Sequence, residues 1–269
     1  MDFIEIIKGF FLGIIQGITE WLPISSTGHL IIFEDLLKLN LSQDFINTFF
    51  VVIQFGSILA VVVLFFNKLN PFKKDEKERN ETINLWFKIA VATIPAGIIG
   101  LLFEDVIDEL LYNSITVAIM LIVYGVLFIL LESRKKEPKT VDLSGITFKL
   151  ALGIGLFQVL ALIPGTSRSG ATIIGAVFLG TSRHVASEFS FFLAVPIMFV
   201  ASAYKLLKVG FAFSGLEIAV LAIGTLTAFF MSLWAIQFLI DYIKKHDFKL
   251  FGYYRIIVGV LILLLYCVF

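Results

Sequence analysis

The stretch QGITEWLPISSTGH, from Gln16 to His29, decides how the rest of the chain is interpreted. It brings a glutamine, a glutamate, serines, a threonine and a histidine into an otherwise apolar sequence, with Pro23 between them. Polar and ionisable side chains at membrane depth are costly, and they usually mark a functional site. A second polar stretch, PGTSRSGAT from Pro164 to Thr172, follows in the other half. We therefore predict that the two stretches meet and form one site.

The composition is that of an integral membrane protein. Of 269 residues, 59% are hydrophobic and 16% are charged, against about 25% charged in soluble domains, and the mean hydropathy is +0.97. The net charge of zero removes any argument for a nucleic-acid partner. The single cysteine, Cys267, excludes an internal disulfide framework and a cysteine-based metal site. We expect no cleavable signal peptide, and one membrane domain over residues 1–269.

Hydropathy predicts the same plan in two repeats, over residues 1–131 and 146–269. Each begins with an apolar run too short to span the membrane, then a polar turn with a proline and a short return. Such a pattern indicates a re-entrant hairpin whose turn is covered by protein. The predicted fold class is all-α, with six transmembrane helices and two re-entrant hairpins. The hairpins are expected over 3–37 and 146–180, and the helices at 45–66, 83–103, 114–131, 187–204, 216–240 and 253–269.

The distribution of basic residues predicts that the two repeats are inverted. The linker 67–82 is rich in Lys and Arg, the linker 104–113 has neither, and the next linker is basic again. Basic linkers usually lie on the cytoplasmic side of a membrane, so we expect the first and third of these on that side and the second outside. After Lys205 and Lys208, the last linker again carries more basic residues, namely Lys244, Lys245, Lys249 and Arg255. Each repeat crosses the membrane three times, so the second repeat must begin on the membrane face opposite to the first. Inverted repeats of this kind place their binding site near the middle of the membrane. Aligning Pro23 with Pro164 sets Ser25-Ser26 against Thr166-Ser167.

The first polar stretch contains candidate reactive groups. Gln16 and Glu20 are four residues apart and share a helix face, so they are candidate ligands of a divalent cation, which prefers oxygen ligands. In our hypothesis Ser26 attacks phosphorus, with Glu20 or His29 as base and later as acid. His29 as the nucleophile is left open. Ser25 and Thr27 belong to the same turn and are expected to contact phosphate.

The second polar stretch has the composition of an oxyanion site. Gly165 and Gly170 permit tight turns and close approach to a ligand, and the turn leads into a helix N-terminus. Arg168 is expected to neutralise charge on the transferring phosphoryl group. The remaining candidate phosphate-binding residues of this turn are Thr166, Ser167, Ser169 and Thr172.

Other interpretations remain open for single residues and for the whole chain. Hydroxyl residues and glycines in membrane helices often serve only packing, and an isolated arginine can extend to the interface. Gln54 and Glu188 lie in apolar surroundings, and two interpretations are open for each. The side chain lines the cavity, where Gln54 is a candidate phosphate ligand, or it takes part in packing or interhelical hydrogen bonds. The alternative function is a transporter or flippase of an anionic lipid or solute, because inverted repeats with broken helices are also a transporter plan.

The two polar stretches, with VVIQFGSILAVVV and SEFSFFLAVP, resemble the bacterial undecaprenyl-diphosphate phosphatase family, also called the bacitracin-resistance proteins. The resemblance covers essentially the whole chain. It implies removal of the terminal phosphate from the C55 isoprenyl diphosphate, which gives the monophosphate carrier used in cell-wall synthesis. It also implies dependence on Mg²⁺ or Ca²⁺ and a site on the outer side of the bacterial plasma membrane. The implied partners are a polyprenyl diphosphate lipid and the membrane, and a homodimer is left open.

By position, the resemblance places the family's acidic motif on Gln16 and Glu20 and its arginine motif on Pro164 to Thr172, with Arg168 central. The serine-rich turn falls on Ser25, Ser26, Thr27 and His29. Many members have glutamate where this chain has Gln16, although the family pattern allows either. This departure leaves Glu20 as the acid of the site.

Overall fold

The computed structural model describes residues 2–134, 136–210 and 213–268, and within them the regular elements are helices. The prediction of an all-α fold is confirmed for this part of the chain. The first half contains α1 (Asp2–Thr19), α2 (Ser26–Leu37), α3 (Gln43–Leu64), α4 (Phe66–Leu69), α5 (Glu76–Leu111) and α6 (Ser114–Ser133). The second contains the 3₁₀ turn η1 (Leu143–Gly145), α7 (Phe148–Val159), the 3₁₀ turn η2 (Leu160–Leu162), α8 (Arg168–Phe178), α9 (Arg183–Val209), α10 (Gly215–Ile243) and α11 (Lys249–Val268).

Five helices of the described part, α3, α5, α6, α9 and α10, are long and apolar enough to cross a membrane. They coincide with five of the expected runs, and the sixth, 253–269, falls on α11 but ends outside the described residues. Helix α5 extends through residues that we predicted as linkers on both sides. At its start, Asp75 Oδ1 accepts the Glu78 N–H at 2.8 Å, and the Glu and Lys residues that follow favour helix.

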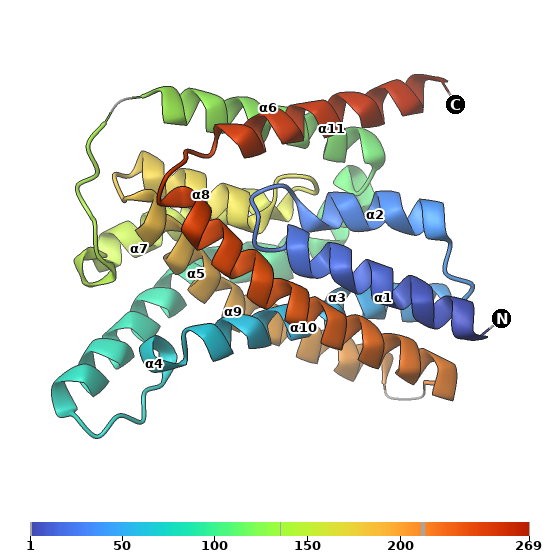
Figure 1. Ribbon diagram of the computed structural model, residues 1–269, viewed down its shortest axis with the longest axis horizontal. Helices are drawn as coiled ribbons and strands as arrows, with labels where there is room; N and C mark the ends of the chain where they lie inside the picture. The colour runs from blue at the N-terminus through green and yellow to red at the C-terminus, as the bar shows by residue number, and fades with distance from the viewer. Residues whose placement is uncertain (1, 135, 211–212, 269) are drawn as a thin grey trace.

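Two pairs of short helices carry the polar stretches to the middle of the molecule. Helices α1 and α2 enter from the side of the N-terminus, whereas α7 and α8 enter from the opposite side (Figure 1). The turn between α1 and α2 and the turn between η2 and α8 meet there, because Ser169 Oγ donates to the Glu20 carbonyl oxygen at 3.2 Å. The predicted meeting of the two polar stretches is confirmed.

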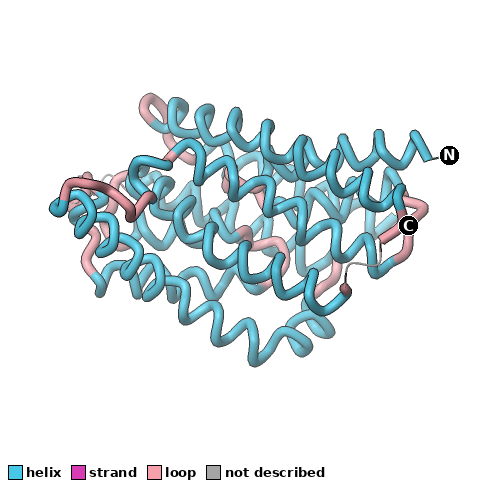
Figure 2. Tube along the Cα trace, turned by 90° about the horizontal axis from the view of Figure 1, so that it is seen from below, coloured by secondary structure: helices cyan, strands magenta, loops and turns pink. Residues whose placement is uncertain are grey.

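Close helix packing holds each pair in place. Most helices run along the long axis of the molecule (Figure 2), with α1 lying along α10 and α7 along α5. A Cβ atom at Gly13 would lie 2.5 Å from the Gly224 carbonyl oxygen of α10, and one at Gly155 would lie 2.4 Å from the Ala92 carbonyl oxygen of α5. Small residues at such crossings let membrane helices approach closely enough for van der Waals attraction to hold them together.

This packing predicts that Gly13→Ala destabilises the protein. The added methyl group must push α1 away from α10, at a cost of about 1–3 kcal/mol. Gly97→Ala in α5 is the matched control, because a Cβ atom there meets nothing within 4 Å. Thermal unfolding in detergent should show a lower melting temperature for Gly13→Ala and no loss for Gly97→Ala; equal melting temperatures would contradict the packing.

Candidate active site

The two turns end in the same local structure. Ser25 and Ser167 both have left-handed backbones, with φ of 76° and 72°, which is rare for residues other than glycine. Each hydroxyl caps the next helix: Ser25 Oγ accepts the Gly28 N–H at 3.4 Å, and Ser167 Oγ accepts the Gly170 N–H at 3.1 Å. Such strain persists only where the surroundings enforce it, and it clusters at functional sites.

The matching caps correct the alignment made on the prolines. They make Ser25 equivalent to Ser167, whereas the alignment of Pro23 with Pro164 sets Ser25 against Thr166. The second turn is one residue longer between its proline and its cap, and it contains Gly165 at φ 88°. The correspondence therefore shifts by one residue.

The carboxylate of Glu20 joins the two turns. Its side chain is 5% exposed. Oε1 accepts a hydrogen bond from Arg168 Nη2 at 2.9 Å, and Oε2 accepts one from Ser26 Oγ at 2.7 Å and one from Gln16 Nε2 at 3.1 Å. Three of the four residues predicted to be catalytic or metal-binding around Glu20 thus contact it, namely Gln16, Ser26 and Arg168.

Helix α9 fixes the guanidinium of Arg168 from the other side. Arg168 Nη1 donates to the Ser190 carbonyl oxygen at 2.8 Å and to Ser190 Oγ at 3.3 Å, and Thr172 Oγ1 lies 2.6 Å from the same hydroxyl. The guanidinium carbon lies 5.5 Å from the centre of the buried Trp21 ring. Sequence reasoning missed Ser190, because one serine among the phenylalanines of α9 looks like packing.

Two helix N-termini meet at the carboxylate of Glu20. Ser26 is the first residue of α2 and Arg168 is the first residue of α8, and both hydrogen-bond Glu20. The first N–H groups of a helix have no partner within it, and this end of the helix carries a partial positive charge. With the guanidinium, the arrangement suits an anion such as phosphate. A hydroxyl, an acid and a cation are therefore in contact at one point.

His29 does not face this cluster. Its Nδ1 lies 2.7 Å from the Ser25 carbonyl oxygen, and its Nε2 lies 2.7 Å from Tyr254 Oη of α11, with the two rings stacked. A carbonyl oxygen can only accept, so we assign the proton of the neutral ring to Nδ1, and Nε2 accepts from the tyrosine. Both ring nitrogens of His29 are occupied without Glu20 or Ser26.

Other predicted residues have structural partners or lie apart. Within the described part of the chain, Thr27 and Gln54 form no side-chain hydrogen bond, and the buried Thr166 hydroxyl has no partner. Glu188 forms a salt bridge with Lys68 of α4, which agrees with the interhelical interpretation left open above. The backbone of Gly165 lies so close to Val117 that a Cβ atom there would clash with it.

Arg255 is the largest difference from the sequence analysis. We counted it among the basic residues of the last linker, although the helix expected at 253–269 also includes its position; it lies within α11 and is completely buried. Its guanidinium donates to the carbonyl oxygens of Pro23 at 3.1 Å, Gly165 at 2.8 Å and Thr166 at 3.0 Å. The signal that could have found it is an arginine inside an apolar run, directly after two tyrosines.

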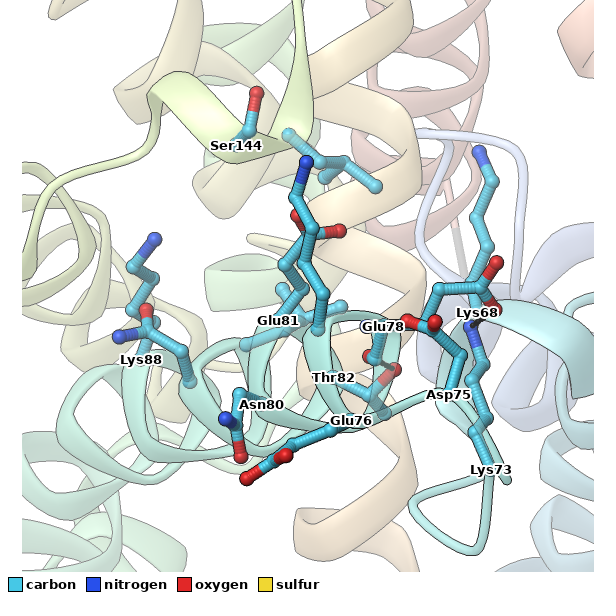
Figure 3. Close-up of a pocket in the computed structure, with 14 residues that line it drawn as sticks. Lys68, Lys73, Asp75, Glu76, Glu78, Asn80, Glu81, Thr82, Lys88 and Ser144 are labelled. Carbon is cyan, nitrogen blue, oxygen red and sulfur yellow. Dashed lines mark hydrogen bonds and ion pairs between the residues drawn. The ribbon is translucent and has the colours of Figure 1, made fainter.

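A cavity of about 970 Å³ lies elsewhere, at the start of α5 (Figure 3). It is lined by four lysines and four acidic residues, so its charges balance, and none of the predicted site residues lines it. We therefore place the candidate active site by the contacts of Glu20 and not by this cavity.

Comparison with known proteins identifies the family. The family described as bacitracin resistance protein BacA matches residues 9–261. Undecaprenyl-diphosphatase 1 of Clostridioides difficile (strain 630) is 63% identical, over 97% of this chain and 96% of the relative. The chain belongs to the bacitracin resistance protein BacA family. Other relatives are undecaprenyl-diphosphatases of Enterococcus faecalis, 56% identical over 98% of both chains, and of Streptococcus thermophilus (strain ATCC BAA-250 / LMG 18311), 51% identical over 97% of this chain and 93% of the relative.

Family membership agrees with the structure at two levels. The stretch matched to the BacA family contains both polar turns and Arg255. It therefore includes Gln16, Ser26 and Arg168, whose side chains hydrogen-bond the carboxylate of Glu20. The resemblance noted from the polar stretches is confirmed. Together with the five apolar helices, this shows a multi-pass membrane protein.

Proposed function

We propose that the protein hydrolyses undecaprenyl diphosphate to undecaprenyl phosphate and phosphate, which returns the lipid carrier to cell-wall synthesis. The names of its relatives support this assignment, and they do not favour the transporter alternative. The observation that carries the proposal is the carboxylate of Glu20, held by the hydroxyl of Ser26 on one side and by the guanidinium of Arg168 on the other. These are the groups that phosphoryl transfer to a serine requires.

In the proposed mechanism Ser26 is the nucleophile. Its Oγ–H already donates to Glu20 Oε2, so the proton passes to Glu20 as Oγ forms a bond to the terminal phosphorus. The bond from that phosphorus to the bridging oxygen breaks, and undecaprenyl phosphate leaves. As it leaves, the bridging oxygen takes the proton from Glu20, which becomes a carboxylate again. Water then attacks the phosphoserine, Glu20 accepts a proton from the water, and this proton passes to Oγ as the bond from Oγ to phosphorus breaks, which restores Ser26 and Glu20. Arg168 and the N-termini of α2 and α8 stabilise the phosphoryl charge in both steps.

His29 has a supporting role in this mechanism. Its Nδ1–H holds the carbonyl oxygen of Ser25, the left-handed residue directly before the nucleophile. Because His29 does not contact Glu20 or the hydroxyl of Ser26, we propose that it fixes the turn and is neither nucleophile nor base.

A divalent cation fits this site only together with the substrate. Glu20 is the one carboxylate in contact with Arg168 and Ser26, and no group of three His, Cys, Asp or Glu residues suited to a metal occurs among the described residues. Gln16 Oε1 is buried without a partner, and an amide oxygen of this kind suits Mg²⁺ or Ca²⁺. We propose that Gln16 and Glu20 hold the ion with phosphate oxygens and waters. The ion, when bound, neutralises charge on the diphosphate.

We also propose the finer architecture: six transmembrane helices and two re-entrant hairpins in inverted repeats, over 1–131 and 146–269. The packing supports it, because the first helix of each hairpin lies on a long helix of the other repeat, α1 on α10 and α7 on α5. The basic linkers support it as well, since those before α5, α7 and α11 lie at one end of the molecule (Figure 1). With that end cytoplasmic, the α1–α2 hairpin opens to the outer side of the bacterial plasma membrane.

The proposed function predicts metal-dependent phosphate release. The purified full chain in detergent should release phosphate from undecaprenyl diphosphate with Mg²⁺. Chelator should abolish release and added Mg²⁺ should restore it, because the diphosphate charge is otherwise not neutralised. Absence of release by the wild type would refute the phosphatase, whereas full release in chelator would refute only the metal.

The proposed roles of Ser26 and His29 predict different losses. Ser26→Ala should lower kcat by about 10³-fold or more, because it removes the nucleophile. His29→Gln should cost about 10-fold at most, since an amide can still donate to the Ser25 carbonyl oxygen. Stopping the reaction with denaturant at neutral pH, which preserves phosphate on serine and on histidine, and analysing the protein by mass spectrometry should find phosphate on Ser26. Phosphate on His29, or undiminished release by Ser26→Ala, would overturn this assignment.

A further inference from the structure

Arg255 is the buried cation that the proposed mechanism does not use. Within the described part of the chain it forms no salt bridge, and its charge is met by backbone carbonyl oxygens and by the ring of Tyr124, whose centre lies 5.5 Å from the guanidinium carbon. A charged side chain without an acidic partner is costly to bury. Its presence therefore needs a reason beyond filling space between α11 and α6.

The contacts of Arg255 divide between the two turns. Nη1 donates to the Pro23 carbonyl oxygen in the first turn, and Nη2 donates to those of Gly165 and Thr166 in the second. Further bonds reach the carbonyl oxygens of Met120 and Leu121 on α6, at 3.4 Å each. A single planar group thus ties both turns to the pair formed by α6 and α11.

These carbonyl oxygens lie close to the reacting groups along the chain. Pro23 is three residues from both Glu20 and Ser26, and Thr166 is two residues from Arg168. A shift of either turn against the other would change the Glu20–Arg168 distance and the direction from which Ser26 approaches phosphorus. Misplacement of reacting groups by about 1 Å can cost about 100-fold in rate.

We infer that Arg255 is the positioning residue of this site, which keeps the acid and nucleophile of one turn in register with the arginine of the other. The inference rests on the proposed phosphatase function. This positioning role requires the forked shape of the guanidinium and not its positive charge alone. Lysine keeps the charge but presents it at one point, whereas arginine presents five donors in a fixed plane.

The test is Arg255→Lys in the full chain, assayed for phosphate release from undecaprenyl diphosphate. We expect kcat to fall about 100-fold and KM to change less than about threefold, because the turns lose their register while the positive charge remains. The matched control is Arg183→Lys: Arg183 pairs with the buried Glu132, and the hydrogen bonds of this pair within the described residues reach neither turn, so this variant should lose stability and keep its kcat.

Each outcome decides the inference. An unchanged kcat in Arg255→Lys, a loss carried by KM alone, or an equal loss of kcat in Arg183→Lys would overturn it. If Arg255→Lys does not fold, Tyr124→Leu replaces it, since this change keeps Arg255 and replaces the buried ring against its guanidinium with another apolar side chain; it should lower kcat several-fold, and an unchanged kcat overturns the inference. Wild-type protein without phosphate release would contradict the proposed function instead.

Discussion

The site depends on one buried ion pair, between Glu20 and Arg168, whose residues are 148 positions apart in the sequence. Removing two charges from water costs several kcal/mol per ion, and the cost is recovered only when the remaining donors and acceptors are also satisfied. Here Ser26 and Gln16 donate to the carboxylate, and Ser190 accepts from Nη1 of the guanidinium, whose buried Nε has no partner in the described part of the chain. The pair therefore requires both irregular turns to reach the same point inside the bundle.

Irregular backbone is tolerated at this depth because protein covers and satisfies it. Ser25 and Ser167 cap the helices that leave the turns, and Arg255 binds carbonyl oxygens of both turns. Glycines on α1 and α7 bring each hairpin against a long helix. Ser26 and Arg168, the first residues of α2 and α8, both contact Glu20, so the positive ends of the two helices lie at the site that we propose binds the diphosphate.

The sequence predicts what is local and leaves unresolved what depends on neighbours. The apolar runs, the proline-containing turns and the grouping of Glu20, Ser26 and Arg168 follow from hydropathy and from the cost of polar residues in lipid. Ser26 and His29 stand three residues apart on α2, but the imidazole is held by the Ser25 carbonyl oxygen and by Tyr254 on α11, and the second contact depends on a distant helix. Arg255 was misplaced because counting basic residues near the ends of apolar runs cannot detect burial. The one-residue shift between the turns depends on backbone conformation, which the prolines do not report.

The coupling between Glu20 and Arg168 in the free energy of unfolding tests most directly whether the two turns form one site. The measurement is a double-mutant cycle with Glu20→Gln, Arg168→Met and the double variant, each unfolded in detergent. If the carboxylate and the guanidinium form the buried pair, each single change leaves an unpaired charge, and the coupling energy should be about 2 kcal/mol or more. Additivity of the two changes to within about 0.5 kcal/mol would contradict the meeting of the two turns.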